Sequence, residues 1–166
     1  MTPDRPSASG AASAPRTGVL FVCLGNICRS PLAEGLFIHR ARERGVLDRF
    51  DVDSAGTGGW HAGEPADDRM RAVAESRGVV LPSRARQVRD EDWTRFHHVL
   101  CMDRDNLDRV RTMGAPEHRS SLFLSVLGDP RRVEVPDPYY GGPEGFELVW
   151  ELADRAVESW LDRLAP

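Results

Sequence analysis

Apolar runs of strand length alternate with amphipathic helical patterns from residue 17 onward. Residues 19–22 form a continuous apolar run, which is typical of a central parallel strand covered on both faces. Residues 50–54 alternate as a half-exposed strand does, and residues 98–102 and 122–126, which are mostly apolar, are predicted as two further short strands. This alternation predicts an α/β fold with three layers, in which helices cover both faces of a four-stranded parallel sheet.

Capping residues mark where the helices between these strands begin and end. Proline is favoured at the first position of a helix, serine and aspartate are favoured as N-caps, and glycine often follows the last turn. The first predicted helix therefore ends at Gly45, and the second ends before Gly78. The predicted starts are Ser30 as N-cap with Pro31 as the first helical residue, Pro65, Asp103 as N-cap, and Pro143.

Two segments lack such patterns. Residues 1–16 are rich in Pro, Ser, Ala and Gly and poor in large apolar groups, so they predict a disordered N-terminal tail. The glycine-rich stretch AGTGGWHAGEP, residues 55–65, predicts a long surface loop that carries Trp60. The remaining chain, residues 17–166, has the length of one domain.

The charge and the basic residues of the chain exclude some classes of ligand and of catalytic site. Its 166 residues carry a net charge of −4, which argues against a general nucleic-acid-binding role because such binding needs clustered cations. All 22 basic residues are arginines, so a Schiff-base lysine and a Walker-loop lysine are both excluded. A bound anion must therefore be held by arginine side chains or backbone N–H groups.

The three cysteines do not form the spacing of a secreted disulfide framework, so a reducing compartment is favoured. The N-terminal segment lacks the apolar core of a signal peptide, and no later stretch approaches the length of a membrane span. These observations predict a soluble, cytoplasmic protein without a membrane partner.

The stretch FVCLGNICRSP, residues 21–31, places two cysteines and an arginine where a strand turns into a helix. In parallel sheets this carboxyl end of the strands is where ligands bind. A loop before a helix start presents converging N–H groups, and Gly25 and Asn26 tolerate the positive φ that such a loop needs. Arg29 adds a planar fork that matches two phosphate oxygens. The pattern predicts an anion cradle.

Cys23 lies at the base of this cradle, where the cationic surroundings favour a thiolate that faces a bound phosphate. Ser30 can donate its hydroxyl to the sulfur and stabilise it as a leaving group. Two alternatives carry less weight. A buried, inert cysteine at a strand end is common, and metal ligation by Cys23 and Cys28 would need further ligands that the chain does not space suitably.

Attack on phosphorus leaves an oxygen that needs a proton, and the segment PDPYY, residues 136–140, offers a general acid. Prolines on both sides of Asp137 stiffen the loop, and Tyr139 and Tyr140 can flank a phenyl ring. Asp-Pro is also a routine turn signal, so this segment gains its meaning only together with the cysteine turn.

These motifs together resemble the low-molecular-weight protein tyrosine phosphatases. The segments VCLGNICRSPLAE, DSAGTGGWHAGEP, ARQ, VLCMDRDNL and DPYYGG occur in the family's order, from residue 17 to residue 164. The resemblance implies a four-stranded parallel sheet and a phosphocysteine intermediate. Cys23 would attack phosphorus, Arg29 would bind the phosphate and stabilise the transition state, and Asp137 would act as general acid and then as base.

The resemblance also implies roles around this centre. The phosphate-binding loop would comprise Leu24, Gly25, Asn26, Ile27, Cys28, Arg29 and Ser30. The hydrogen-bond network that holds this loop would be formed by Asn26, Ser30 and Ser54. The walls of the substrate-binding cleft would be formed by Leu24, Ile27, Trp60, Tyr139 and Tyr140. No metal or other cofactor is implied. The partners would be a phosphotyrosine-containing protein and inorganic phosphate, as product and competitive ligand.

Two further positions concern redox protection and loop support. Cys28 matches a cysteine that forms a reversible disulfide with an oxidised nucleophile, which would protect Cys23 from over-oxidation. The family often carries a histidine at the position of Ser83, so the support of the loop is expected to differ here.

Three alternatives remain. Arsenate reductases of the same fold relay oxidation through a further cysteine pair, whereas only Cys101 is left here, on a predicted buried strand. Protein arginine phosphatases resemble this loop but carry threonine at the position of Ile27 and lack the tyrosine pair. A catalytically silent phosphopeptide-binding module is a remote alternative, because Cys23, Arg29 and Asp137 are all present.

Overall fold

A single parallel sheet organises the chain. The computed structural model describes residues 15–166, so the expected tail of residues 1–16 lies almost wholly outside the described residues. The strands run in the order β3-β2-β4-β5, and each neighbouring pair is parallel. They are β2 (Thr17–Cys23), β3 (Phe50–Gly56), β4 (His98–Cys101) and β5 (Ser120–Leu122). The predicted four-stranded parallel sheet is confirmed.

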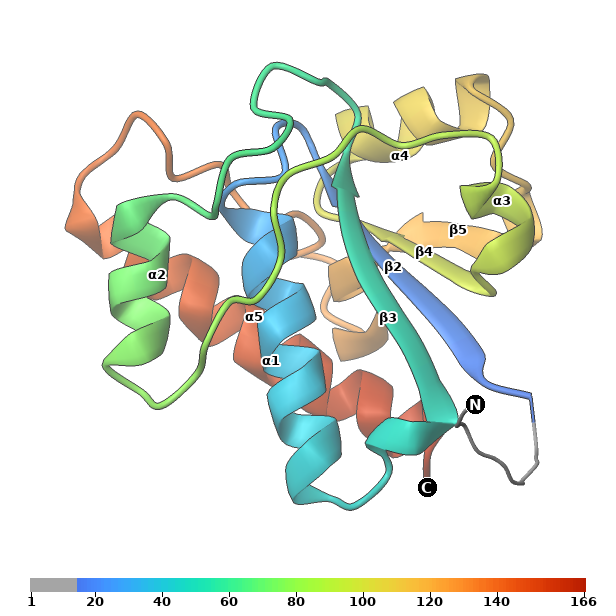
Figure 1. Ribbon diagram of the computed structural model, residues 1–166, viewed down its shortest axis with the longest axis horizontal. Helices are drawn as coiled ribbons and strands as arrows, with labels where there is room; N and C mark the ends of the chain where they lie inside the picture. Colours follow the sequence, from blue (N-terminus) through green and yellow to red (C-terminus); the bar gives the residue numbers. More distant parts are fainter. Residues whose placement is uncertain (1–14) are drawn as a thin grey trace, which may run out of the picture.

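Helices cover both faces of this sheet, as Figure 1 shows, with α1, α2 and α5 on one side and α3 and α4 on the other. They are α1 (Arg29–Glu43), α2 (Asp68–Glu75), α3 (Asp92–Arg95), α4 (Arg104–Thr112) and α5 (Pro143–Leu164), with short 3₁₀ helices at Leu47–Arg49, Glu117–Arg119 and Phe123–Leu127. None of the helices within residues 15–166 is long and apolar enough to cross a membrane.

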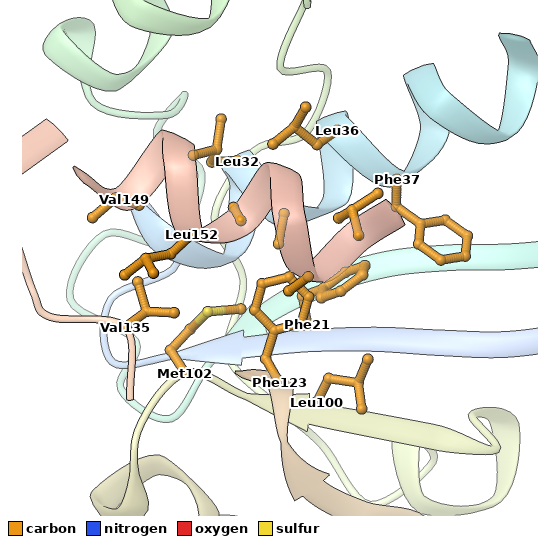
Figure 2. Packing of buried hydrophobic residues seen from close by; sticks show 14 of the residues in the cluster. Phe21, Leu32, Leu36, Phe37, Leu100, Met102, Phe123, Val135, Val149 and Leu152 are labelled. Atoms are coloured by element: carbon orange, nitrogen blue, oxygen red, sulfur yellow. The ribbon is translucent and has the colours of Figure 1, made fainter. Parts of the chain in front are cut away.

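Strand β2 is central, and its side chains pack into two hydrophobic clusters, one on each face of the sheet. Val19 and Phe21 belong to the cluster under α1 and α5, whereas Leu20 and Val22 belong to the cluster on the side of α3 and α4. This two-sided burial explains why the strand reads as a continuous apolar run. In Figure 2, Phe21 lies between the helices and the sheet, with its ring centroid 5.4 Å from that of Phe123 in an edge-on contact.

The fourth strand differs from the prediction. Strand β5 ends at Leu122, where residues 122–126 were expected to be extended, and a 3₁₀ helix follows. The turn buries Phe123, and its carbonyl accepts a hydrogen bond of 2.8 Å from Trp160 Nε1 on α5. A short and mostly apolar segment fits either a strand or a tight helical turn, and here the packing under α5 decides.

Two helix starts were predicted at the wrong residue. Helix α1 begins at Arg29, with Cys28 as an N-cap that makes no side-chain hydrogen bond, so Ser30 lies inside the helix. Helix α2 begins at Asp68, three residues after Pro65, because the side chain of Asp67 accepts from the amide of Arg69 and caps it. Pro65 instead forms an isolated bridge with Arg84.

The other two starts agree with the sequence. Asp103 caps α4, and its side chain and that of Asn106 form a reciprocal capping box. Pro143 is the first residue of α5. Strand β3 runs two residues beyond its expected end, to Gly56, which pairs with Cys23 at the end of β2. The loops after β2 and β3 therefore leave the sheet side by side (Figure 1).

Candidate active site

The turn between β2 and α1 joins the strand and the helix that the sequence predicted. Cys23 is the last residue of β2, and Arg29 begins α1 at the other end of the turn. Asn26 has a φ of 58°, the only positive φ of a residue other than glycine within residues 15–166. Gly25 does not have a positive φ; a Cβ atom there would lie 3.0 Å from Cδ2 of His61, so its small size makes room for that ring.

The sulfur of Cys23 has two polar neighbours from its own loop. The backbone N–H of Asn26 donates to Cys23 Sγ at 3.3 Å, and the Ser30 hydroxyl lies 3.0 Å from the same sulfur. The position of Ser30 inside the first turn of α1, rather than at its cap, is what brings the hydroxyl onto the sulfur. Donors of this kind stabilise a thiolate over a thiol.

The side chain of Asn26 ties the loop to β3. Its Nδ2 donates to Ser30 Oγ at 2.8 Å and to Ser54 Oγ at 3.0 Å, and its Oδ1 accepts from the amide of Arg86 at 2.9 Å. These side-chain atoms therefore belong to one buried, connected network. The structure thus brings together three residues, Asn26, Ser30 and Ser54, that the sequence analysis associated with loop support.

Arg29 is held from behind by an acid that the sequence analysis did not connect with it. Its Nη1 donates to Asp103 Oδ2 at 2.7 Å and to the carbonyl of Val135 at 2.9 Å. Burial opposes the charge of Arg29, but Cys23 and the hydrogen-bonded Asp103 outweigh it and raise the pKa of the guanidinium. Arg29 therefore points its charge toward the loop in a fixed orientation.

Asp137 faces the same loop from the segment before α5. Its Oδ2 lies 3.7 Å from Nη2 of Arg29, and its Oδ1 accepts from the amide of Tyr139 at 3.1 Å. The side chain is 44% exposed, so solvent and a ligand both reach the carboxyl group. Cys23, Arg29 and Asp137, which are up to 114 positions apart in the sequence, thus surround one space.

That space is a cavity of about 300 Å³, at the lower end of the size of small-molecule sites. It lies outside the carboxyl ends of the parallel strands, as expected for this class of fold. Its lining comprises Cys23, Leu24, Gly25, Ile27, Cys28, Arg29, Trp60, His61, Asp137, Tyr139 and Tyr140. A thiol, a guanidinium and a carboxyl group meet at its polar end.

A family model for low molecular weight phosphotyrosine protein phosphatase matches residues 18–166. The chain belongs to this family. A relative from Streptomyces coelicolor, named low molecular weight protein-tyrosine-phosphatase, is 42% identical over 149 residues, which cover 86% of this chain and 90% of the relative.

Solved structures agree with this assignment of the fold. A protein tyrosine phosphatase from Entamoeba histolytica, with Hepes in the active site, superimposes with a TM-score of 0.84 at 37% identity, covering 89% of this chain and 96% of the other. A Drosophila arginine phosphatase also superimposes with a TM-score of 0.84, at 28% identity, covering 89% of this chain and 98% of the other. The family fold therefore occurs in proteins named for two different phosphorylated residues.

In this family member, aromatic rings form the outer wall of the cavity. Trp60 and Tyr140 are 72% and 94% exposed, and Leu24 beside them is 45% exposed. Tyr139 lies edge-on to Tyr140, with ring centroids 5.0 Å apart, and the Arg69 guanidinium lies 5.3 Å from the Tyr139 ring centroid. Large apolar rings that stay exposed at a cavity mouth indicate a surface built for contact with a ligand.

His61 is a cavity residue that sequence reasoning missed. Its ring lines the cavity between Gly25 and the aromatic wall, 6.4 Å from Tyr139 between centroids, and its Nδ1 lies 3.0 Å from Glu64 Oε1. The signal available in the sequence was its place directly after Trp60 in the glycine-rich loop. A single histidine in a loop carries little information without that spatial context.

The two cysteines other than Cys23 differ in their access to the cavity. Cys28 lines the cavity, although its side chain is largely buried, whereas Cys101 lies on β4 without any exposed surface. Burial raises the pKa of both thiols. Both therefore remain thiols at neutral pH. Of the three cysteines, Cys23 is the one whose sulfur accepts a hydrogen bond from a backbone N–H, that of Asn26.

Proposed function

We propose that this phosphatase hydrolyses phosphotyrosine and aryl phosphates through a phosphocysteine intermediate on Cys23. One observation carries the proposal: the sulfur of Cys23 accepts from the loop at the polar end of a cavity that Arg29 and Asp137 also line. As a family member the chain is a hydrolase, with phosphoproteins as substrates and phosphate as product. The assignment of roles to individual residues is part of the proposal.

In the first step, the phosphate group binds in the loop of residues 24–30, whose N–H groups and the Arg29 guanidinium hold the non-bridging oxygens. The Cys23 thiolate attacks phosphorus in line with the tyrosine oxygen, so an S–P bond forms as the P–O bond breaks. Asp137 gives its proton to the departing phenolate. Preorganised donors stabilise the charge that spreads over the equatorial oxygens.

In the second step, the product tyrosine leaves and water enters. Asp137, now a carboxylate, takes a proton from this water as the water oxygen attacks phosphorus. The S–P bond breaks, inorganic phosphate is released, and the sulfur regains its electron pair as a thiolate. The Ser30 hydroxyl, 3.0 Å from the sulfur, stabilises this leaving group by a charge-assisted hydrogen bond.

The aromatic wall supports phosphotyrosine as the preferred substrate. A phenyl ring that extends from the bound phosphate passes Ile27 and then meets Trp60 and the pair Tyr139 and Tyr140, which offer edge-on and stacking contacts. Phosphoarginine is the second candidate, because an arginine phosphatase shares the fold. Its guanidinium gains less from this wall, since the Arg69 cation already lies over the Tyr139 ring.

Arsenate reduction receives less support from the described residues. That chemistry relays oxidation from the nucleophile to further thiols, and Cys101 has no exposed surface on β4. A silent phosphopeptide-binding module is also disfavoured, because such a module needs neither the Asp137 carboxyl near Arg29 nor hydrogen-bond donors on the sulfur.

The proposed partners are phosphotyrosine-containing proteins, with inorganic phosphate as a competitive ligand of the same loop. We propose a cytoplasmic location, which is supported by three cysteines that are not joined in disulfides, since persistent disulfides belong to oxidising compartments. We also propose that Cys28 forms a reversible disulfide with an oxidised Cys23, which is supported by the contact of both residues with one cavity.

The test compares three substrates with one purified protein. Release of phosphate is measured from phosphotyrosine and phosphoarginine peptides, and arsenate reduction is measured with thioredoxin or glutaredoxin as reductant. We expect phosphotyrosine to give the highest kcat/KM and the Cys23→Ser variant to release no phosphate. Full activity of Cys23→Ser, or a preference for phosphoarginine, contradicts the proposal.

A further inference from the structure

A buried carboxyl group terminates the hydrogen-bond network of the active-site loop. Glu34 lies in the second turn of α1 and is almost fully buried. Its Oε1 accepts from the Ser54 hydroxyl at 2.6 Å and from the Ser83 hydroxyl at 2.7 Å. The two serines therefore share one carboxylate oxygen as their acceptor.

We propose that Glu34 is a positioning residue that fixes the direction of the hydrogen bonds leading to Cys23. This inference rests on the proposed function, because it concerns the nucleophile of that reaction. Glu34 touches neither the cavity nor the sulfur, so any effect on Cys23 must pass through Ser54 and Asn26.

The direction of each hydrogen bond between Glu34 and Cys23 follows from counting donors and acceptors. A hydroxyl has one hydrogen, and Ser54 gives its hydrogen to Glu34. Ser54 Oγ is then left as an acceptor, so Asn26 must present Nδ2 to it, at 3.0 Å. The same Nδ2 donates its second hydrogen to the Ser30 hydroxyl at 2.8 Å.

Ser30 Oγ is thereby occupied as an acceptor, and its own hydrogen is free to point at Cys23 Sγ, 3.0 Å away. The backbone N–H of Arg86 acts at the other end of the amide, because it donates to Asn26 Oδ1 at 2.9 Å and supports the same orientation. All hydrogens of the chain from Glu34 to Cys23 are therefore assigned, and the last of them stabilises a thiolate rather than competing with it.

Removal of the Glu34 acceptor undoes this assignment. The Ser54 and Ser83 hydroxyls, 3.5 Å apart, are then left to bond to each other, and either of them can be the donor. When Ser83 donates, the hydrogen of Ser54 turns toward Asn26 Nδ2, which is itself a donor, and the bond between Asn26 and Ser54 is weakened. The direction of the hydrogen bonds is then no longer fixed, and the donation from Asn26 to Ser30 loses its support.

The charge of Glu34 is not needed for this role. Burial raises the pKa of Glu34, the hydrogen bonds from Ser54 and Ser83 lower it, and the nearby Asp53 and Arg86 act in opposite directions. A protonated carboxyl group still offers one carbonyl oxygen to both serines. Glutamine offers the same oxygen, so Glu34→Gln is the conservative variant that retains the direction, whereas Glu34→Met keeps the volume without any comparable acceptor.

The experiment follows alkylation of Cys23 by iodoacetate as a function of pH, with the modified residue located by mass spectrometry. The reaction reports the thiolate and does not depend on phosphatase turnover, so its outcome is separate from that of the proposed function. We expect the midpoint for Glu34→Met to move to higher pH by about one unit, the loss of one hydrogen bond to a charged group. Glu34→Gln should follow the unsubstituted protein.

Two further variants show whether the effect passes through Ser54. Ser83→Ala removes the other donor to Glu34 and should leave the midpoint unchanged, because Ser83 donates to Glu34 outside the chain to the sulfur. Ser54→Ala should shift the midpoint as Glu34→Met does, and the double variant of Glu34 and Ser54 should be no worse than Ser54→Ala alone.

Melting temperatures accompany every variant. Where Glu34→Met does not fold, Ser54→Ala and Glu34→Gln carry the test, since they predict opposite results. Several outcomes overturn the proposal: an unshifted midpoint in folded Glu34→Met or in Ser54→Ala, a shift in Glu34→Gln equal to that in Glu34→Met, or fully additive shifts in the double variant. Equal shifts in Ser83→Ala and Glu34→Met also overturn it, because they indicate a general loss of packing.

Discussion

Asp103 performs two tasks at once, and its replacement by asparagine separates them. Its Oδ1 accepts from the amide of Asn106 and caps α4, while its Oδ2 accepts from Nη1 of Arg29 at 2.7 Å. In the Asp103→Asn variant, the side-chain amide keeps an oxygen for the cap but presents an NH₂ group to a guanidinium that can only donate. We therefore expect the orientation of Arg29 to be lost while the helix cap survives.

The structure sets the size of the effect. A hydrogen bond to a charged group contributes about 1.5–3 kcal/mol, which corresponds to roughly 10- to 150-fold in kcat/KM. Asp103 is 24% exposed, so water partly replaces the lost acceptor, and Arg29 retains the carbonyl of Val135. We therefore expect the lower part of that range, a loss of about 10- to 30-fold in kcat/KM for an aryl phosphate. The inhibition constant of inorganic phosphate should rise in parallel.

The assay measures kcat/KM with an aryl phosphate and the melting temperature of the same samples. Asparagine caps helices about as well as aspartate, so the melting temperature of Asp103→Asn should stay close to that of the unsubstituted protein. Asp103→Ala loses about 1 kcal/mol of capping as well, or about 2–4 °C. Asp105→Asn, in the same helical turn, is the control for a lost charge. The reasoning fails if Asp103→Asn keeps kcat/KM within twofold, or if Asp105→Asn loses as much.

Four further outcomes follow from the structure. Asp137→Ala should lower kcat by roughly 10²- to 10⁴-fold for phosphotyrosine, the effect of a lost general acid, and an unchanged kcat contradicts that role. Tyr140→Ala should raise KM for a phosphotyrosine peptide several-fold at an unchanged melting temperature, because its ring is 94% exposed. An equal rise in the inhibition constant of inorganic phosphate would indicate damage to the phosphate-binding loop instead. Trp160→Phe leaves the buried carbonyl of Phe123 without its donor and should cost about 1–3 kcal/mol of unfolding free energy without lowering kcat/KM, as denaturant titration and kinetics can show. Because burial raises the pKa of Glu34, its ionisation reduces stability as pH rises above about 4.5, so Glu34→Gln should raise the melting temperature at pH 7 and lose that advantage near pH 4; a constant difference contradicts this.

Local sequence patterns predicted those parts of the fold that depend on the burial and backbone geometry of neighbouring residues. The buried strand β2 and the start of α5 at Pro143 follow from burial on both faces and from the fixed φ of proline. The start of α2 did not follow, because Pro65 is equally compatible with an extended bridge, and Asp67 is the better cap. The residues 122–126 were misread because a short apolar run does not distinguish a strand from a 3₁₀ turn.

The candidate site also combines local features, which the sequence predicts, with tertiary contacts, which it does not. The loop from Cys23 to Arg29 is one continuous motif, so residue types and spacing could place its side chains at one site. The pairing of Arg29 with Asp103 spans 74 positions, and the acceptor role of Glu34 depends on where α1 meets β3. Only the tertiary arrangement places those groups together. Asp103 had been identified as a helix cap, which is correct and describes half of its function.

The central claim is that Cys23 carries the phosphoryl group during turnover. Rapid acid quenching of the Asp137→Asn variant with an aryl phosphate, followed by peptide mass spectrometry, tests it directly, because loss of the general base slows hydrolysis of the intermediate. An aryl phosphate with a good leaving group is used, so that the first step needs little acid assistance. The account predicts a phosphorylated peptide modified at Cys23, and none in the double variant with Cys23→Ser. A phosphoryl group on another residue, or turnover with no modified cysteine at any quench time, contradicts it.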